Sequence, residues 1–161
     1  NDLLQLPYFM GAEKAGTIEA AILGAEKGTE WIKICLDYYT DKTFIKQDSS
    51  LDIRKLPEIM VEELEKFKPI HYLDVEEMKN IKNMDFQKEI LVMPNEYFSP
   101  KIFDSREVLI TPRTYAIHHY QNSWFSHKAK IYYRTRTILI RILGYNFIQK
   151  TERILMPSRF K

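Results

Sequence analysis

Two adjacent histidines stand close to a serine and a tryptophan in the second half of the sequence, as His118, His119, Ser123 and Trp124. A neutral imidazole is the commonest metal ligand among side chains, and an imidazolium suits a phosphate. This cluster could therefore hold a metal ion together with a diphosphate group. The alternative interpretation is a structural histidine beside a core tryptophan, and the residue types alone leave both open.

The segment before these histidines bears on which of them would face a site. Residues 115–117 follow a turn-like Thr-Pro-Arg-Thr at 111–114 and have the composition of a β-strand. Side chains alternate across a strand, so His118 and His119 would point to opposite faces. We assign the metal to His118 and treat His119 as a substrate-binding residue. A register slip of one residue would exchange the faces of the two side chains, so His119 is the alternative metal ligand.

Three segments carry a family resemblance. Residues 118–124 (HHYQNSW) resemble the C-terminal HH-x-x-x-SW motif of the DXD-containing glycosyltransferases, the family of capsular polysaccharide transferases and initiating mannosyltransferases. Residues 24–33 (GAEKGTEWIK) with 35–39 (CLDYY), and residues 93–101 (MPNEYFSPK), are similar to two further segments of that family. The three occur in the family's order, and the resemblance covers roughly residues 3–128.

The resemblance implies a fold class and an activity. The fold would be α/β: the C-terminal portion of a GT-A-like nucleotide-sugar transferase, with a mixed sheet, flanking helices and a basic helical tail. The activity would be transfer of a sugar from a nucleotide-sugar donor to a glycan or lipid-linked acceptor in capsular or exopolysaccharide synthesis, with retention of anomeric configuration. The family's Asp-x-Asp motif binds a divalent metal, Mn²⁺ or Mg²⁺.

This sequence contains no Asp-x-Asp, and its nearest approach is Asp-Val-Glu at 74–76. Residues 1–4 look like the segment that would follow that motif in the family. We therefore expect an incomplete catalytic unit, inactive or very weak when tested alone. We also expect a strand edge left without its partner to be covered, for example by a second copy in a homo-oligomer.

The resemblance also implies roles for individual residues. Besides His118 at the metal, Ser123 and the Trp124 indole N–H would donate hydrogen bonds to the diphosphate, and Lys128 would approach the phosphates. Where the family has small residues, often Asn-Gly, this chain has Glu19 followed by two alanines. Glu19 is thus the candidate catalytic carboxylate, for binding a sugar hydroxyl or assisting proton transfer; the alternative is a solvated glutamate at the entrance of a strand.

Composition indicates a folded chain with an uneven charge. Of its 161 residues, 45% are hydrophobic and 13% aromatic, enough to bury a core. Residues 126–161 carry nine Lys or Arg against one Glu, or +8, while the remaining 15 basic and 21 acidic residues give −6. We expect two parts, a transferase part at 1–125 and a basic helical tail at 126–161.

The basic tail suggests either nucleic acid or an anionic membrane surface as a partner. No Gly-rich RNA motif, zinc spacing or helix-turn-helix accompanies it, so we do not expect nucleic acid. No signal peptide or apolar run of about eighteen residues occurs, which favours a cytoplasmic protein, peripheral at the inner face of the cell membrane. The rival to the transferase is therefore a non-catalytic remnant or membrane-surface interaction domain that uses this tail.

Periodicity and turn residues predict the elements that must position these groups. We expect strands at 7–12 and 18–25, the second more buried, a helix at 30–39 capped by Thr29, and a buried strand at 90–93. A helix beginning at Pro57 would end before Pro69, and a short hairpin would include residues 108–110. A last helix at 128–143, between Ser126 and Gly144, would have an aliphatic stripe that docks on its own domain or on a membrane.

Overall fold

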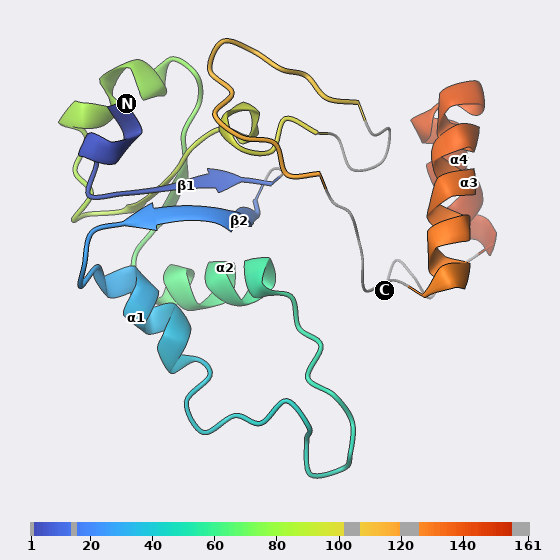
Figure 1. The fold of residues 1–161 in the computed structure, drawn as a ribbon, viewed down its shortest axis with the longest axis horizontal. Helices are drawn as coiled ribbons and strands as arrows, with labels where there is room; N and C mark the ends of the chain where they lie inside the picture. The colour runs from blue at the N-terminus through green and yellow to red at the C-terminus, as the bar shows by residue number, and fades with distance from the viewer. Residues whose placement is uncertain (1, 14–15, 102–106, 120–125, 156–161) are drawn as a thin grey trace. The chain divides into compact units, whose positions relative to one another are not determined.

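The computed structural model describes residues 2–13, 16–101, 107–119 and 126–155 (Figure 1). The chain divides into two compact units: unit 1 comprises residues 1–99 and 111–116, and unit 2 comprises residues 100–110 and 117–161. Both strands and helices are present, so the expected mixed α/β class is confirmed.

Unit 1 is built around two strand pairs. β1 (Tyr8–Ala12) pairs antiparallel with β2 (Ile18–Ala25), and β3 (Ile70–Tyr72) pairs in parallel with β4 (Ile90–Val92). A parallel bridge between Gly11 and Met93 joins the pairs. The Met93 N–H donates to the Met10 carbonyl at 2.9 Å, and the Ala12 N–H donates to the Met93 carbonyl at 2.8 Å. β1 therefore has backbone partners on both sides.

The two predicted N-terminal strands are confirmed, but the prediction that the second is the more buried is wrong. β2 pairs only with β1 within the described part of the chain, and its second half alternates between half-buried and exposed positions. β1 is buried at every position except Phe9, because β2 covers one of its edges and the chain after β4 covers the other. β2 thus presents a strand edge.

One face of the sheet is covered by α1 (Glu30–Asp37) and α2 (Leu56–Phe67), as Figure 1 shows. Trp31 and Cys35 of α1 pack with Met60 and Leu64 of α2 in one hydrophobic cluster, which confirms both helical periods. Burial raises the pKa of the Cys35 thiol to about 11. Thr29 precedes α1 as expected, but its hydroxyl donates to the Glu26 carbonyl at 2.7 Å and does not cap the helix.

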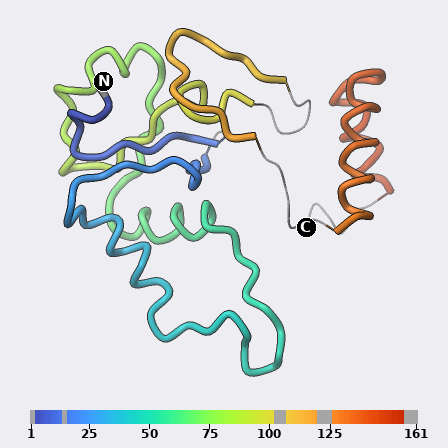
Figure 2. The backbone as a smooth tube through the Cα atoms, viewed as in Figure 1, coloured from blue at the N-terminus to red at the C-terminus, as the bar shows by residue number. Residues whose placement is uncertain are grey.

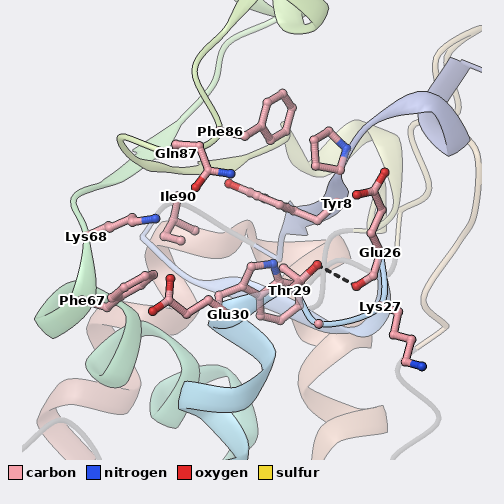
Figure 3. A pocket seen from close by; sticks show the side chains of 13 residues that line it. Tyr8, Glu26, Lys27, Thr29, Glu30, Phe67, Lys68, Phe86, Gln87 and Ile90 are labelled. Atoms are coloured by element: carbon pink, nitrogen blue, oxygen red, sulfur yellow. Dashed lines mark hydrogen bonds between the residues drawn. The ribbon is translucent and has the colours of Figure 1, made fainter.

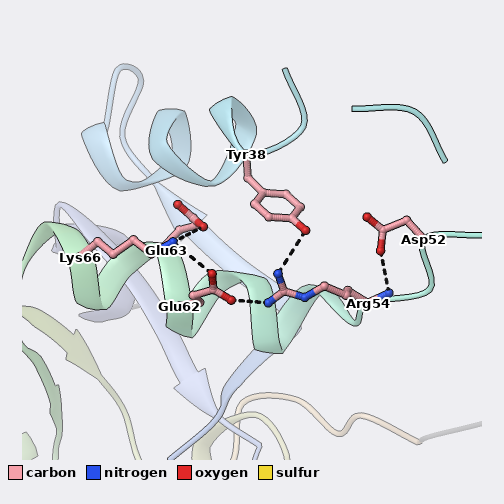
Figure 4. Close-up of polar contacts among 6 residues, drawn as sticks. All are labelled: Tyr38, Asp52, Arg54, Glu62, Glu63 and Lys66. Atoms are coloured by element: carbon pink, nitrogen blue, oxygen red, sulfur yellow. Dashed lines mark hydrogen bonds and ion pairs between the residues drawn. The ribbon is translucent and has the colours of Figure 1, made fainter. Parts of the chain in front are cut away.

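The chain between α1 and α2 is a long loop, whose path Figure 2 traces. Arg54 anchors the C-terminal end of this loop. One of its guanidinium nitrogens donates to the Tyr38 hydroxyl at 3.3 Å, and another donates to Glu62 at 2.5 Å (Figure 4). Lys66 also contacts Glu62, at 3.1 Å, and Glu63, at 2.8 Å. Glu62 and Glu63 therefore belong to an ion-paired surface of α2.

The opposite face of the sheet is covered by short 3₁₀ helices: η1 (Asp2–Gln5), η2 (Glu77–Asn83) and η3 (Asn95–Tyr97). They surround a second cluster that contains Leu91, Met93, Tyr97 and Phe98. The buried strand predicted at 90–93 is confirmed. β3 and η2 were not predicted, because residues 70–83 show no clear period.

Unit 2 contains α3 (His127–Leu143) and α4 (Tyr145–Leu155). Ser126 caps α3 by accepting a hydrogen bond from the Ala129 N–H at 3.3 Å, and Gly144 ends it at a φ of +83°, a conformation that favours glycine. Both boundaries were predicted. At 101–110, the expected hairpin is represented by an antiparallel bridge between Lys101 and Val108.

None of the helices in the described ranges has the length and apolar content needed to cross a membrane.

Candidate functional site

Glu19 lies at the second position of β2 and is only 2% exposed. Its carboxylate accepts hydrogen bonds from the Ala21 N–H at 2.7 Å and from the Ser99 hydroxyl. Burial of a carboxylate is costly unless such donors replace water. The alternative of a solvated glutamate at a strand entrance is therefore wrong, whereas a catalytic role for Glu19 stays a prediction.

Ser99 is fully buried, and its N–H donates to the Asn95 carbonyl at 2.7 Å. It follows Phe98, whose ring stacks on Phe9 at a centroid distance of 5.7 Å and an interplanar angle of 26°. A Cβ on Gly11 would lie 2.5 Å from the Phe98 ring, so only glycine fits there. Tyr97 and Phe98 are thus core residues of unit 1.

The Phe9 ring also covers the backbone of Gly24, a glycine of the 24–33 segment. A Cβ on Gly24 would lie 2.2 Å from the Phe9 ring, so the close approach of ring and backbone requires glycine. Phe9 therefore contacts Phe98 on one side and the Gly24 backbone on the other. The motif segments at 24–33 and 93–101 are joined through this ring.

The expected strand at 115–119 is not formed. The N–H groups of Tyr115 and Ala116 both point to the Tyr97 carbonyl, at 2.8 and 3.3 Å, whereas a strand ladder would use a different carbonyl for each bond. Arg113 anchors the segment by donating to Glu96 at 2.6 and 3.3 Å. This hydrogen-bonded ion pair lowers the pKa of the Glu96 carboxyl.

Because no strand forms here, strand alternation does not place the two histidines on opposite faces. In unit 2, His118 is half-buried and His119 is exposed. The Lys101 ammonium donates to the His119 backbone carbonyl at 2.8 Å, which ties the 93–101 segment to the histidine segment. His118 as the metal ligand and His119 as a substrate contact remain predictions.

Three further residues were predicted to contact the phosphates. Ser123 and Trp124 lie outside the described residues. Lys128 is exposed in the first turn of α3. Glu19 belongs to unit 1 and the two histidines belong to unit 2.

Within the ranges that the structure describes, no group of three or more His, Cys, Asp or Glu side chains could hold a metal ion. His118 could supply one nitrogen ligand to a divalent cation. The remaining ligands would have to come from other residues, as expected for a sequence without an Asp-x-Asp motif.

Sequence reasoning missed two polar features. Ser99 was not singled out as a partner of Glu19, and no local pattern marks it, since the two are 80 positions apart. His71, in β3, lies between two carboxylates, with Nε2 at 3.0 Å from Glu77 and Nδ1 at 3.3 Å from Glu89. In the sequence, His71 stands between Ile70 and Tyr72, shortly after Pro69. This is the only local sign that it occupies a structured position.

Comparison with known proteins gave no relative. No protein-family model matches the chain, and neither a curated protein nor a solved structure matches it.

Proposed function

We propose that this chain is the acceptor-side and metal-side part of a glycosyltransferase that moves a sugar from a nucleotide-sugar to a glycan or lipid-linked acceptor. The sequence resemblance suggests capsular or exopolysaccharide synthesis as the setting. Such an enzyme would work at the cytoplasmic face of the cell membrane.

One observation carries this proposal. The segments that resemble the family make direct contacts within each unit, although they are far apart in sequence. In unit 1 the Phe9 ring contacts the Gly24 backbone and the Phe98 ring, and in unit 2 Lys101 donates to the His119 carbonyl. These contacts support the proposal, because residues of different motif segments lie together within each unit.

The proposed chemistry needs stabilisation of a leaving nucleoside diphosphate. A divalent metal, when bound, would neutralise its developing negative charge. His118 would bind on the metal side, and Ser123, Trp124 and Lys128 would hold the phosphates. The buried Glu19, fixed by Ser99 and the Ala21 N–H, would shape the acceptor end of β2 and is our candidate for the carboxylate that contacts the sugar.

The test is calorimetric binding of nucleoside diphosphates to the full chain, with and without Mn²⁺. We expect binding that requires Mn²⁺ and that is lost in His118→Ala but kept in His127→Ala, a histidine exposed at the start of α3. Absence of binding by the folded protein, or equal binding by the two variants, would contradict the proposal.

A second function, attachment to an anionic membrane surface, is favoured by the residues of α3. Ile131, Ile138 and Ile142 are 55%, 49% and 71% exposed, whereas α3 buries Ile140. At 100° per residue, the three lie about 160–200° around the helix from Ile140. Arg134 and Arg141 lie beside this stripe, an arrangement that suits an interfacial helix.

Co-sedimentation with vesicles tests this second function. We expect the chain to bind vesicles that contain phosphatidylserine and not vesicles of phosphatidylcholine alone, and the Ile138→Ser, Ile142→Ser double variant to lose binding. If the double variant binds as well as the parent chain, the stripe is not the attachment surface.

A further inference from the structure

A pocket of about 330 Å³ opens in unit 1 where β1 begins and β2 ends (Figure 3). This volume is at the lower end of the range for small-molecule sites. Tyr8 pairs with Ala25 at this end of the strand pair, whereas Ile18 pairs with Ala12 at the other. At about 3.3 Å per residue, the strand separates Glu19 from Glu26 by roughly 20 Å. The pocket is therefore distinct from the Glu19 end of the sheet.

Aromatic rings form the apolar part of this pocket. Tyr8 meets the Trp31 ring edge-on at 5.9 Å and the Phe86 ring at 5.0 Å, and all three residues line the pocket with Phe67. Tyr8 is fixed further, because its hydroxyl accepts from the Leu91 N–H at 3.0 Å. Tyr8 and Trp31 are buried, and the half-buried rings of Phe67 and Phe86 offer the apolar surface that suits the C–H face of a sugar ring.

Hydrogen-bond donors and acceptors surround the aromatic rings of the pocket. Figure 3 shows Glu26 after β2, Glu30 in α1, Lys68 after α2 and Gln87 before β4. The carboxylates accept, the ammonium donates, and the amide of Gln87 does both. Adjacent sugar hydroxyls, each a donor and an acceptor, match such a set.

The charges around the pocket favour a neutral ligand. Two carboxylates, Glu26 and Glu30, and two ammonium groups, Lys27 and Lys68, line it, so their formal charges cancel. Glu30 lies in the first turn of α1, where its carboxylate already complements the positive end of the helix dipole. The pocket therefore has no net formal charge that would select an anion or a cation.

Trp31, which lines this pocket, carries an unsatisfied polar group. Its side chain is 4% exposed, and its indole N–H is buried with no acceptor among the residues that the structure describes. An unsatisfied buried donor costs about 1–3 kcal/mol.

We propose that this pocket binds a neutral pyranose sugar and forms a glycan-binding site separate from the Glu19 end of the sheet. This site goes beyond the proposed function, because it requires neither a nucleotide nor a metal. It would hold a sugar residue of a glycan chain at a distance from the Glu19 end of the sheet.

Two-dimensional ¹⁵N–¹H NMR of the full chain tests this site, by titration with maltose, lactose and mannobiose without nucleotide or metal. The two tryptophans give two indole signals, and Trp31→Phe assigns them. At least one of these sugars should shift the Trp31 indole and Gly28 amide signals saturably. Glu30→Gln combined with Gln87→Ala should weaken this binding about tenfold, as loss of one or two hydrogen bonds predicts.

Glu58→Gln is the matched control, because Glu58 lies in the first turn of α2 as Glu30 does in α1, but does not line the pocket. It should bind like the parent chain. The site is disproved if none of the three sugars shifts these signals in folded protein, if the double variant binds equally well, or if inorganic phosphate alone produces the shifts. Because no nucleotide or Mn²⁺ is present, these outcomes are independent of the nucleotide-binding test.

Discussion

The Ser99 hydroxyl donates a hydrogen bond to the Glu19 carboxylate, and both side chains are almost completely buried. This bond joins β2 to the segment after η3 across 80 positions of sequence. Ser99→Ala should destabilise the chain by about 1–3 kcal/mol, because a buried carboxylate loses a donor. Urea denaturation of Ser99→Ala, Glu19→Gln and the double variant measures the coupling.

The double-variant cycle is the control for this first prediction. If the two substitutions act through one hydrogen bond, their effects should be clearly non-additive. Strictly additive effects would mean that the bond contributes nothing to stability.

Gly11 has no room for a side chain. Gly11→Ala would place a methyl group 2.5 Å from the Phe98 ring and should destabilise unit 1 by about 1–3 kcal/mol, the usual cost of overpacking. Thermal unfolding followed by circular dichroism measures the change. Phe98→Leu in the Gly11→Ala background should restore part of the lost stability, and no difference between Gly11→Ala and the parent chain would refute the contact.

Arg136 and Glu152 form the main polar contact between α3 and α4. The guanidinium donates to both carboxylate oxygens, at 2.7 and 3.0 Å, and each side chain is 12% exposed. Arg136→Ala leaves a buried carboxylate without its counterion and should cost about 3 kcal/mol in the stability of the helix pair.

Arg134→Ala is the matched control for Arg136→Ala, because Arg134 is an exposed arginine two positions earlier in α3. The melting of helical circular dichroism should shift downward in Arg136→Ala and hardly in Arg134→Ala. Equal shifts would show that the Glu152 contact is not what stabilises the pair.

Glu96 makes stability depend on pH. Its hydrogen-bonded ion pair with Arg113 lowers the pKa of the Glu96 carboxyl below 4.5, so the unfolded state binds more protons in this range. The contribution of this ion pair to stability is present above about pH 4.5. It is lost as the pH falls through the pKa of Glu96 in the folded state, which is the lower of the two pKa values. Denaturation at pH 6 and at successively lower pH should show a shallower loss for Arg113→Gln than for Arg134→Gln, and parallel curves would count against the pair.

Elements with a strong local period could be predicted, and elements that depend on distant partners could not. Trp31 with Cys35, and Met60 with Leu64, follow helical spacing, so α1 and α2 were expected near their observed positions. β3 has three residues and takes its hydrogen bonds from β4, about twenty positions later, so no local pattern marks it.

In the candidate site too, features that depend on distant partners could not be predicted from local patterns. The spacing around Tyr115 resembles a strand, yet its N–H bonds to the Tyr97 carbonyl in an irregular segment. Glu19 has the sequence surroundings of an exposed strand end, and only the folded chain brings Ser99 to it. Composition cannot reveal a partner 80 positions away.

The most direct test of the proposed transferase site is to locate Mn²⁺ by its paramagnetic broadening of histidine ring signals in the presence of a nucleoside diphosphate. The chain has four histidines, and single substitutions assign them. We predict that the His118 ring signals broaden first and most strongly, and only when the nucleotide is present. Broadening of His71 or His127 in preference to His118, or no broadening of any histidine, would contradict the account.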